Sequence, residues 1–262
     1  MHRRTWQPLA GAVFVTATSL VAAWIVPAPH AQGATLTWNF TQDFSATANP
    51  APDSHGNTGV WSYLQGTAHN PATYSLLPQL VANQCNNHAV DFWNTASGYP
   101  AVAHNRGTTT ATCATATIPA GQGFVHPSSA GPAIIGWKSP ITGTVSITGS
   151  VVDDDALCGD GILWSIDKGA TTLASGGFAN GGSQGFSAGT GGSSLASRAV
   201  SAGDKLYLLV VPKGSFDCDT TGVNLTITAE STTSSGGAGG APGGGAGGAG
   251  SGAGGGAGGA GG

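Results

Sequence analysis

Charged side chains are scarce in this chain. Only 8% of its 262 residues are charged, against about a quarter in an average domain. Eight basic residues stand against twelve acidic ones, and no basic run occurs, so the formal charge is −4. A nucleic-acid-binding surface needs clustered Lys and Arg to neutralise phosphates, which argues against nucleic acid as a partner. Exposed faces of a helical bundle also need charged residues, so a helical scaffold is disfavoured.

Familiar catalytic and metal-binding motifs are missing as well. The sequence contains no Cys-x-x-Cys, His-x-His or His-Glu-x-x-His, and no Gly-x-Ser-x-Gly elbow directly follows a predicted strand. A triad of a histidine, Asp91 and a serine is conceivable, but no spacing marks a nucleophile. Glu230 is the single glutamate, so the usual acid of a glycosidase is lacking from the body of the chain.

The two ends differ in composition from the middle. Residues 1–33 begin with Arg3 and Arg4, continue with an apolar run and end in small residues, which is typical of a cleaved secretory signal peptide; a membrane anchor is the alternative. Residues 231–262 are almost wholly Gly and Ala and predict a flexible spacer. We expect a secreted or extracellular protein, with the cell surface as the alternative location, and no membrane segment after signal cleavage.

Residues 34–230 predict one all-β domain. Short apolar runs recur between Gly, Asn and Pro turns, and residues 143–152 alternate strictly at Val145, Ile147 and Val151. The run from Lys205 to Val211 is apolar on both faces and indicates a central strand. No long stretch has helical periodicity. The pattern predicts an antiparallel β-sandwich, most simply a jelly roll.

Four cysteines lie in this domain, and an even number in an exported chain favours two disulfides. Three connectivities are possible. We favour Cys85–Cys113 and Cys158–Cys218, because Cys158 and Cys218 both lie in acidic loops that follow long strands.

The second of these bonds would gather six aspartates near one end of the sandwich. Carboxylates and loop carbonyls are ligands that Ca²⁺ prefers, so a structural calcium ion is predicted there. The alternative is that these residues cap exposed turns in water. The predicted calcium ligands are Asp153, Asp154, Asp155, Asp160, Asp217 and Asp219.

Aromatic residues in loop-flanked positions suggest a surface on which sugar rings stack, with nearby amides binding hydroxyls. The alternative for each is core packing, which Trp137 and Trp164 are expected to show because they lie within the clearest strands. The proposed stacking residues are Trp61, Tyr63, Trp93 and Tyr99, and the amides are Asn57, Asn70, Asn86, Asn87 and Asn94.

Short motifs spread from Asp43 to Ala229 resemble those of secreted bacterial jelly-roll modules of the carbohydrate-binding-like and galactose-binding-like type. They are residues 57–63 (Asn-Thr-Gly-Val-Trp-Ser-Tyr), Leu77-Pro78, His126-Pro127, and residues 136–140, 159–162, 202–206 and 217–221. The resemblance implies a non-catalytic accessory or surface domain.

The sequence therefore predicts a secreted, non-catalytic β-sandwich that binds an extracellular glycan or cell-wall component, with calcium as a structural ion. A structural or adhesive cell-surface protein with a Gly-rich stalk is the first alternative. An extracellular hydrolase with unassigned residues is the second.

Overall fold

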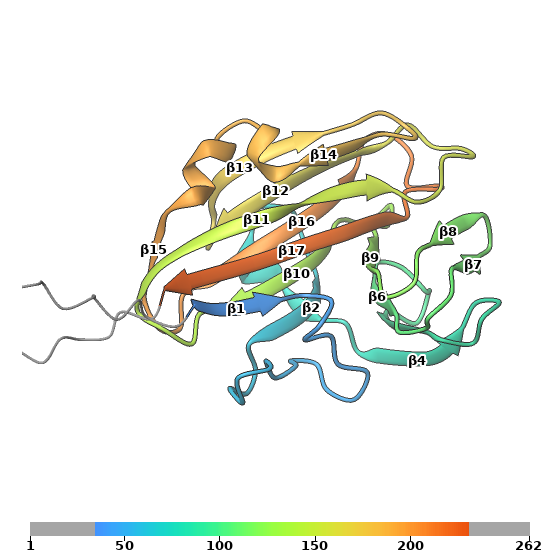
Figure 1. Cartoon of the computed structure of the whole chain (residues 1–262). Coiled ribbons are helices and arrows are strands. Elements are labelled where there is room, and N and C mark those ends of the chain that lie inside the picture. The colour runs from blue at the N-terminus through green and yellow to red at the C-terminus, as the bar shows by residue number, and fades with distance from the viewer. Residues whose placement is uncertain (1–34, 231–262) are drawn as a thin grey trace, which may run out of the picture. The chain divides into compact units, whose positions relative to one another are not determined.

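The computed structural model describes residues 35–230, without the side chain of Glu230. The predicted signal peptide and spacer lie outside these residues. Two antiparallel β-sheets pack face to face, and only three single-turn 3₁₀ helices interrupt the strands in this part of the chain (Figure 1). The predicted antiparallel β-sandwich is confirmed.

The first sheet runs in the order β14-β11-β17-β9-β6-β5-β4, with β1 paired to β17 and β15 paired to β11. Its strands are β1 (Thr35–Asn39), β4 (Gln79–Gln84), β5 (Val90–Asn94), β6 (Ala101–Asn105), β9 (Gly123–His126), β11 (Gly143–Asp153), β14 (Ser183–Gly185), β15 (Arg198–Val200) and β17 (Thr221–Glu230).

The second sheet runs in the order β13-β12-β16-β10-β2-β3, and a separate hairpin joins β7 to β8. Its strands are β2 (Trp61–Gln65), β3 (Ser75–Leu76), β10 (Ala133–Lys138), β12 (Ile162–Lys168), β13 (Thr171–Gly177) and β16 (Lys205–Pro212). The hairpin consists of β7 (Ala111–Cys113) and β8 (Ala116–Ile118), and the 3₁₀ turns are η1 (Pro71–Thr73), η2 (Phe186–Ala188) and η3 (Gly192–Ala196).

The core lies between the inner faces of the two sheets. Val145, Ile147 and Val151 of β11 are buried there, as their alternation requires, while Ser146 and Thr148 between them are not. Strand β16 buries both of its faces: Leu206, Leu208 and Val210 point into the core, and Tyr207 and Leu209 lie on the outer face.

Tryptophans form the centre of this core, and the N–H groups of two of them donate to carboxylates of one loop. Trp38 Nε1 donates to Asp53 Oδ2 at 2.7 Å, and Trp61 Nε1 donates to Asp43 Oδ2 at 2.9 Å. All four of these side chains belong to buried residues. Trp38 lies in β1 of the first sheet and Trp61 in β2 of the second sheet. The two hydrogen bonds therefore fix the loop between β1 and β2 to both sheets.

Two smaller apolar clusters cover the outer faces of the sheets. The hairpin β7–β8 packs against the outer face of the first sheet, where Ala103, Ile118 and Phe124 are buried (Figure 1). On the second sheet, Tyr74 beside η1 packs against a cluster that contains Tyr207 and Leu209. Both outer faces are therefore partly covered rather than fully exposed to solvent.

Both predicted disulfides are present. Cys85–Cys113 joins the end of β4 to the hairpin, and Cys158–Cys218 joins the loops that follow β11 and β16. Two disulfides indicate an oxidising environment. The described residues include no helix long and apolar enough to span a membrane.

Replacement of Asp43 tests the buried indole–carboxylate bonds. We expect Asp43→Leu to lower the free energy of unfolding by about 1–3 kcal/mol, because Trp61 Nε1 is left buried without an acceptor. Asp43→Asn keeps an acceptor oxygen and should cost less. Urea unfolding followed by tryptophan fluorescence measures both, and equal losses in the two variants would contradict this role.

Candidate functional site

The predicted sugar-stacking surface does not exist as a unit. Trp61 and Tyr63 each have 0% of their surface exposed and lie in the core. Tyr63 Oη accepts a hydrogen bond from the Ser45 backbone amide at 2.9 Å, and burial raises the pKa of this phenol well above its usual value. The prediction that these two side chains stack on sugars is wrong, because the β2 face that carries them packs against the other sheet.

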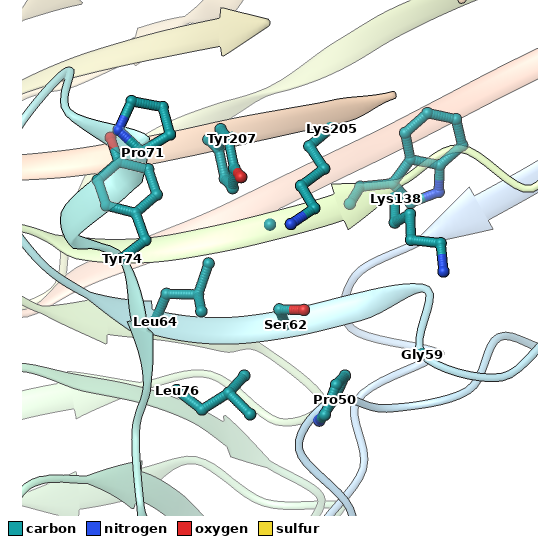
Figure 2. A pocket seen from close by; sticks show the side chains of 12 residues that line it. Pro50, Gly59, Ser62, Leu64, Pro71, Tyr74, Leu76, Lys138, Lys205 and Tyr207 are labelled. Atoms are coloured by element: carbon teal, nitrogen blue, oxygen red, sulfur yellow. The ribbon is translucent and has the colours of Figure 1, made fainter. Parts of the chain in front are cut away.

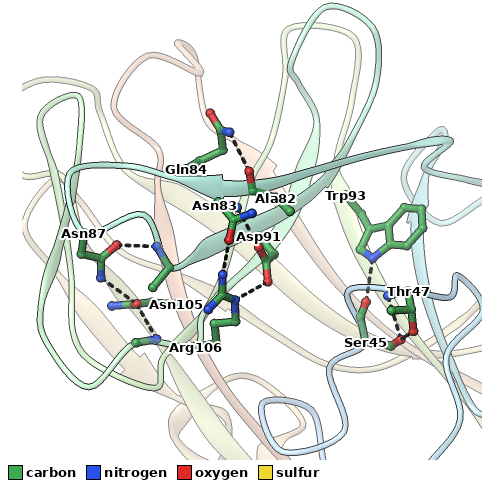
Figure 3. Close-up of polar contacts among 12 residues, drawn as sticks. Ser45, Thr47, Ala82, Asn83, Gln84, Asn87, Asp91, Trp93, Asn105 and Arg106 are labelled. Carbon is green, nitrogen blue, oxygen red and sulfur yellow. Dashed lines mark hydrogen bonds and ion pairs between the residues drawn. The ribbon is translucent and has the colours of Figure 1, made fainter.

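The other two predicted stacking residues lie apart from that face. Trp93 packs against the edge of the core, and its Nε1 donates to the Ser45 carbonyl at 2.8 Å (Figure 3). Tyr99 is exposed at 43% and its ring lies on that of His126, with centroids 4.1 Å apart.

The carboxylate of Asp91, the candidate partner of a catalytic histidine, already accepts hydrogen bonds from Arg106 and Asn83. Arg106 Nε donates to Asp91 Oδ2 at 2.9 Å, and the Asn83 backbone amide donates to Oδ1 at 2.9 Å (Figure 3). Arg106 also donates to the Asn83 side chain. No described histidine forms a hydrogen bond with Asp91, so this residue is part of a structural network rather than a triad.

Of the six aspartates of the predicted calcium site, Asp153 and Asp160 accept hydrogen bonds from backbone amides of the loops. Asp153 accepts from the amides of Asp155 and Gly181, and Asp160 accepts from the amide of Ser215. Asp155 also accepts from Thr115 Oγ1 at 2.6 Å. Within residues 35–230, no group of three or more His, Cys, Asp or Glu side chains is arranged to hold a metal ion. The calcium ion stays a prediction.

Three of these aspartates keep a buried oxygen without a hydrogen-bond partner: Asp154 Oδ2, Asp155 Oδ1 and Asp219 Oδ2. Burial raises the pKa of the Asp154 and Asp219 carboxyls to about 7, and the charges of neighbouring aspartates add to the effect. Both are therefore partly protonated near neutral pH.

The best-formed hollow in the second sheet is a groove on its outer face, of about 400 Å³. One row of paired residues crosses the five strands β2, β10, β16, β12 and β13: Ser62, Gly136, Tyr207, Asp167 and Thr172. Gly136 lies at the centre of this row, where a Cβ would lie only 3.1 Å from Leu64 Cδ1 and 3.2 Å from Tyr207 Cδ1, so neighbouring side chains approach its backbone closely. A glycine inside a strand often marks such a close approach.

The walls of this groove are apolar on one side and aromatic at one end. Leu64, Leu76 and Pro50 line the lower part in Figure 2, and Tyr74 and Tyr207 close one end. The two tyrosine rings meet edge to face with centroids 4.9 Å apart. Burial raises the pKa of Tyr74 to about 12, with the charge of Asp167 contributing, and burial also raises that of Tyr207. Both phenols are therefore protonated at neutral pH.

Two lysines lie at the other end of the groove (Figure 2). Lys138 of β10 and Lys205 of β16 are directly opposite each other in the ladder. Neither forms an ion pair with a residue that the structure describes, whereas Arg106 and Lys168 pair with Asp91 and Asp204. Like charges in directly opposed positions destabilise a sheet. The groove therefore ends in uncompensated positive charge.

A histidine–aspartate pair lies beside the tyrosines. Asp167 is fully buried, and its Oδ2 lies 2.8 Å from Nδ1 of His69, which is half-exposed on the loop that leads to η1. Thr172 Oγ1 lies 3.3 Å from the same nitrogen. With Nδ1 bound to the carboxylate, Nε2 of the neutral ring carries the free lone pair. Asp167 is opposite Tyr207 in the ladder, so this pair adjoins the groove.

The sequence pattern did not predict this groove. The strands that hold Gly136, Lys138 and Lys205 were predicted, but not their register, which alone places the two lysines opposite each other. The signal that could have found the site was Gly136 within an apolar strand, a weak one. His69 and Asp167 are 98 residues apart, and no local pattern relates them.

Serine nucleophiles receive no support from the structure. Residues 181–185 and 185–189 both fit Gly-x-Ser-x-Gly, but Ser183 lies in β14 and Ser187 in the 3₁₀ turn η2. Neither has a hydrogen bond to a described histidine.

Comparison with known proteins identifies no family for this chain. No family model matches, and no curated protein matches. Among solved structures, the Stig cyclase Fisc from Fischerella sp. TAU matches with a TM-score of 0.32 and 9% identity, covering 78% of this chain and 92% of the cyclase. Another cyclase from Fischerella sp. TAU matches with a TM-score of 0.25 and 11% identity, covering 75% and 84% of the two chains.

The matched solved structures are cyclases, not carbohydrate-binding modules. The prediction of a non-catalytic carbohydrate-binding module is wrong, because the burial of Trp61 and Tyr63 removes the surface on which it depended. At such low TM-scores the similarity supports no particular reaction for this chain.

The buried carboxyls predict how stability depends on pH. An unfolded aspartate titrates near its ordinary value of 3.8, whereas Asp154 in the fold titrates near 7. The folded state thus binds more protons in this window, so the contribution of Asp154 is complete below pH 3.8 and is lost as the pH rises through about 7.

We expect Asp154→Asn to match the native protein in stability at about pH 4 and to exceed it at about pH 8, because the amide stays neutral. Urea midpoints at the two pH values measure this. Leu157→Asn, at an exposed and uncharged position in the same loop, is the control and should leave the pH slope unchanged. A native-like pH slope in Asp154→Asn would contradict the assignment.

Proposed function

We propose that the protein binds a small organic anion in the groove of the second sheet, with the acid group between Lys138 and Lys205 and an apolar or aromatic body against the tyrosine end. The unpaired, directly opposed lysines carry this proposal. An anion between them removes their mutual repulsion, so binding would relieve a cost that the empty groove bears.

The rest of the groove suits the body of such a ligand. Leu64, Leu76 and Pro50 offer apolar contacts, and Tyr207 offers a protonated hydroxyl. The volume of about 400 Å³ is within the ordinary range for small-molecule sites. The disulfides and the leader-like residues 1–33 support action outside the cytoplasm, in a secreted protein.

Binding of 2-naphthoate tests the proposal, with the uncharged 2-naphthamide as its matched probe. We expect naphthoate to bind, and Lys205→Met to weaken it about tenfold, because the charge is lost while the apolar stem remains. The same change should raise the free energy of unfolding by about 0.2–1 kcal/mol, because it removes the like-charge pair.

Isothermal titration calorimetry and urea unfolding measure the two effects. Lys213→Met, at an exposed lysine outside the groove, is the control and should alter neither. Equal affinity for naphthoate and naphthamide, or an unchanged affinity in Lys205→Met, would rule out the anion site.

The His69–Asp167 pair favours a second candidate function, hydrolysis of an ester ligand in the groove. Asp167 would hold the ring so that Nε2 removes a proton from a water molecule. The water oxygen then bonds to the carbonyl carbon, the ester C–O bond breaks, and the proton passes to the leaving alkoxide. The pair has the orientation that a general base needs.

Hydrolysis of the mono-4-nitrophenyl ester of a dicarboxylic acid tests this second function. We expect His69→Gln to abolish turnover while 2-naphthoate still binds, because the glutamine lacks a titratable nitrogen. His55→Gln, at another exposed histidine, is the control. No turnover by the native protein above the buffer rate would remove hydrolysis of such esters from consideration.

A further inference from the structure

A second hollow, on the outer face of the first sheet, has a different chemistry from the groove. Its volume is about 340 Å³. Residues of three strands line it together with the rim of the hairpin: Val81, Gln84, Cys85, Phe92, Asn94, Gly98, Tyr99, Cys113, Ala114, Phe124, His126 and Thr220. No charged carboxylate or lysine belongs to this lining.

The register of β5, β6 and β9 explains why a hollow forms there. One row pairs Phe92 with Ala103 and Ala103 with Phe124. The next row on the same face pairs Asn94 with Ala101 and Ala101 with His126. The central alanines are short, so the larger side chains on either side form walls around them.

Aromatic rings form two of these walls. Phe92 and Phe124 meet edge to face with centroids 5.4 Å apart. On the other side, Tyr99 lies over His126, with ring centroids 4.1 Å apart and an angle of 31° between the planes. A planar ring placed among them would contact aromatic faces and edges, the arrangement that such rings prefer.

Two side chains of the hollow, Asn94 and His126, offer hydrogen-bond acceptors. His126 Nδ1 lies 2.7 Å from the Pro127 carbonyl, and because a carbonyl only accepts, Nδ1 carries the hydrogen and Nε2 has the lone pair. Burial lowers the pKa of His126, which keeps the ring neutral. Asn94 Oδ1 is buried without a partner among the described residues.

A buried acceptor without a donor costs free energy, and a ligand that supplies the donor removes that cost. We propose that this hollow is a second binding site, for a planar aromatic molecule that carries an O–H or N–H group, with Asn94 and His126 as its acceptors. An anion is disfavoured there, because no lysine or arginine lines the hollow. The site is independent of the lysine groove.

The size fits this ligand class. A dry cavity of about 150 Å³ accommodates benzene, so a volume of about 340 Å³ has room for a two-ring molecule. The exposed Tyr99 lies at the rim, where its ring can cover a bound molecule.

Binding of 2-naphthol tests the proposal, with 2-methoxynaphthalene as the matched probe that lacks the donor. We expect the methoxy compound to bind on the order of tenfold more weakly. Amide chemical shifts of the whole chain locate the site: Gly98, Ala114 and Thr220 should respond, and Ser62 and Gly136 in the groove should not. Shifts confined to the groove, or equal affinity for the two probes, would overturn the proposal.

Two variants separate the aromatic wall from the acceptor. His126→Phe keeps a flat ring but removes Nε2, so it should reduce the preference for naphthol over the methoxy compound and leave Asn94 as the remaining acceptor. Because His126 is buried and its replacement can disturb folding, Tyr99→Ala at the exposed rim provides the second variant and should weaken both probes about threefold or more. Leu163→Ala, an exposed apolar residue on the other sheet, is the control. Unchanged binding in Tyr99→Ala would contradict the site.

Discussion

The structure depends on two buried hydrogen bonds from indole N–H groups to carboxylates in its core. Trp38 and Trp61 donate to the buried carboxylates of Asp53 and Asp43, and both acceptors come from the loop between β1 and β2. A buried donor without a partner costs about 1–3 kcal/mol. These bonds therefore tie the loop to the strands and hold the aromatic residues inside the sandwich. Ligand sites are left to the outer faces, where small residues interrupt the rows of larger side chains.

Both hollows arise in the same physical way. Gly136 in the groove and Ala101 and Ala103 in the second hollow are the short members of rows that otherwise carry long side chains. In a close-packed protein such gaps forfeit contacts on every side, so a row of large side chains would be the more stable choice if packing alone decided. In the first sheet the hairpin β7–β8, held by Cys85–Cys113, builds one side of the gap. In the second sheet the segment around η1 does the same through Tyr74.

The parts of the fold that follow from local pattern could be read from the sequence. The alternation in residues 143–152 marks β11, the apolar run from Lys205 marks β16, and the acidic contexts of Cys158 and Cys218 indicated their bond. Strands β4, β6 and β9 were not predicted, because Ala-Val-Ala-His and Gly-Phe-Val-His have neither alternation nor length. The burial of Trp61 was also missed, since its acceptor Asp43 lies 18 residues away and the pairing becomes visible only in three dimensions. The groove depends on register across five strands, which no single segment encodes.

The distribution of charge sets Lys138 and Lys205 apart from the paired cations Arg106 and Lys168. In a chain with 8% charged residues, most positions on the outer faces are filled by neutral side chains. Arg106 and Lys168 each have a carboxylate partner, so their charges are compensated within the fold. Lys138 and Lys205 are directly opposed and have no such partner among the described residues, although a serine or threonine at either position would fit the sheet without repulsion. An anion between these lysines would recover the stability that they forgo, and this is the physical basis of the anion site that we propose.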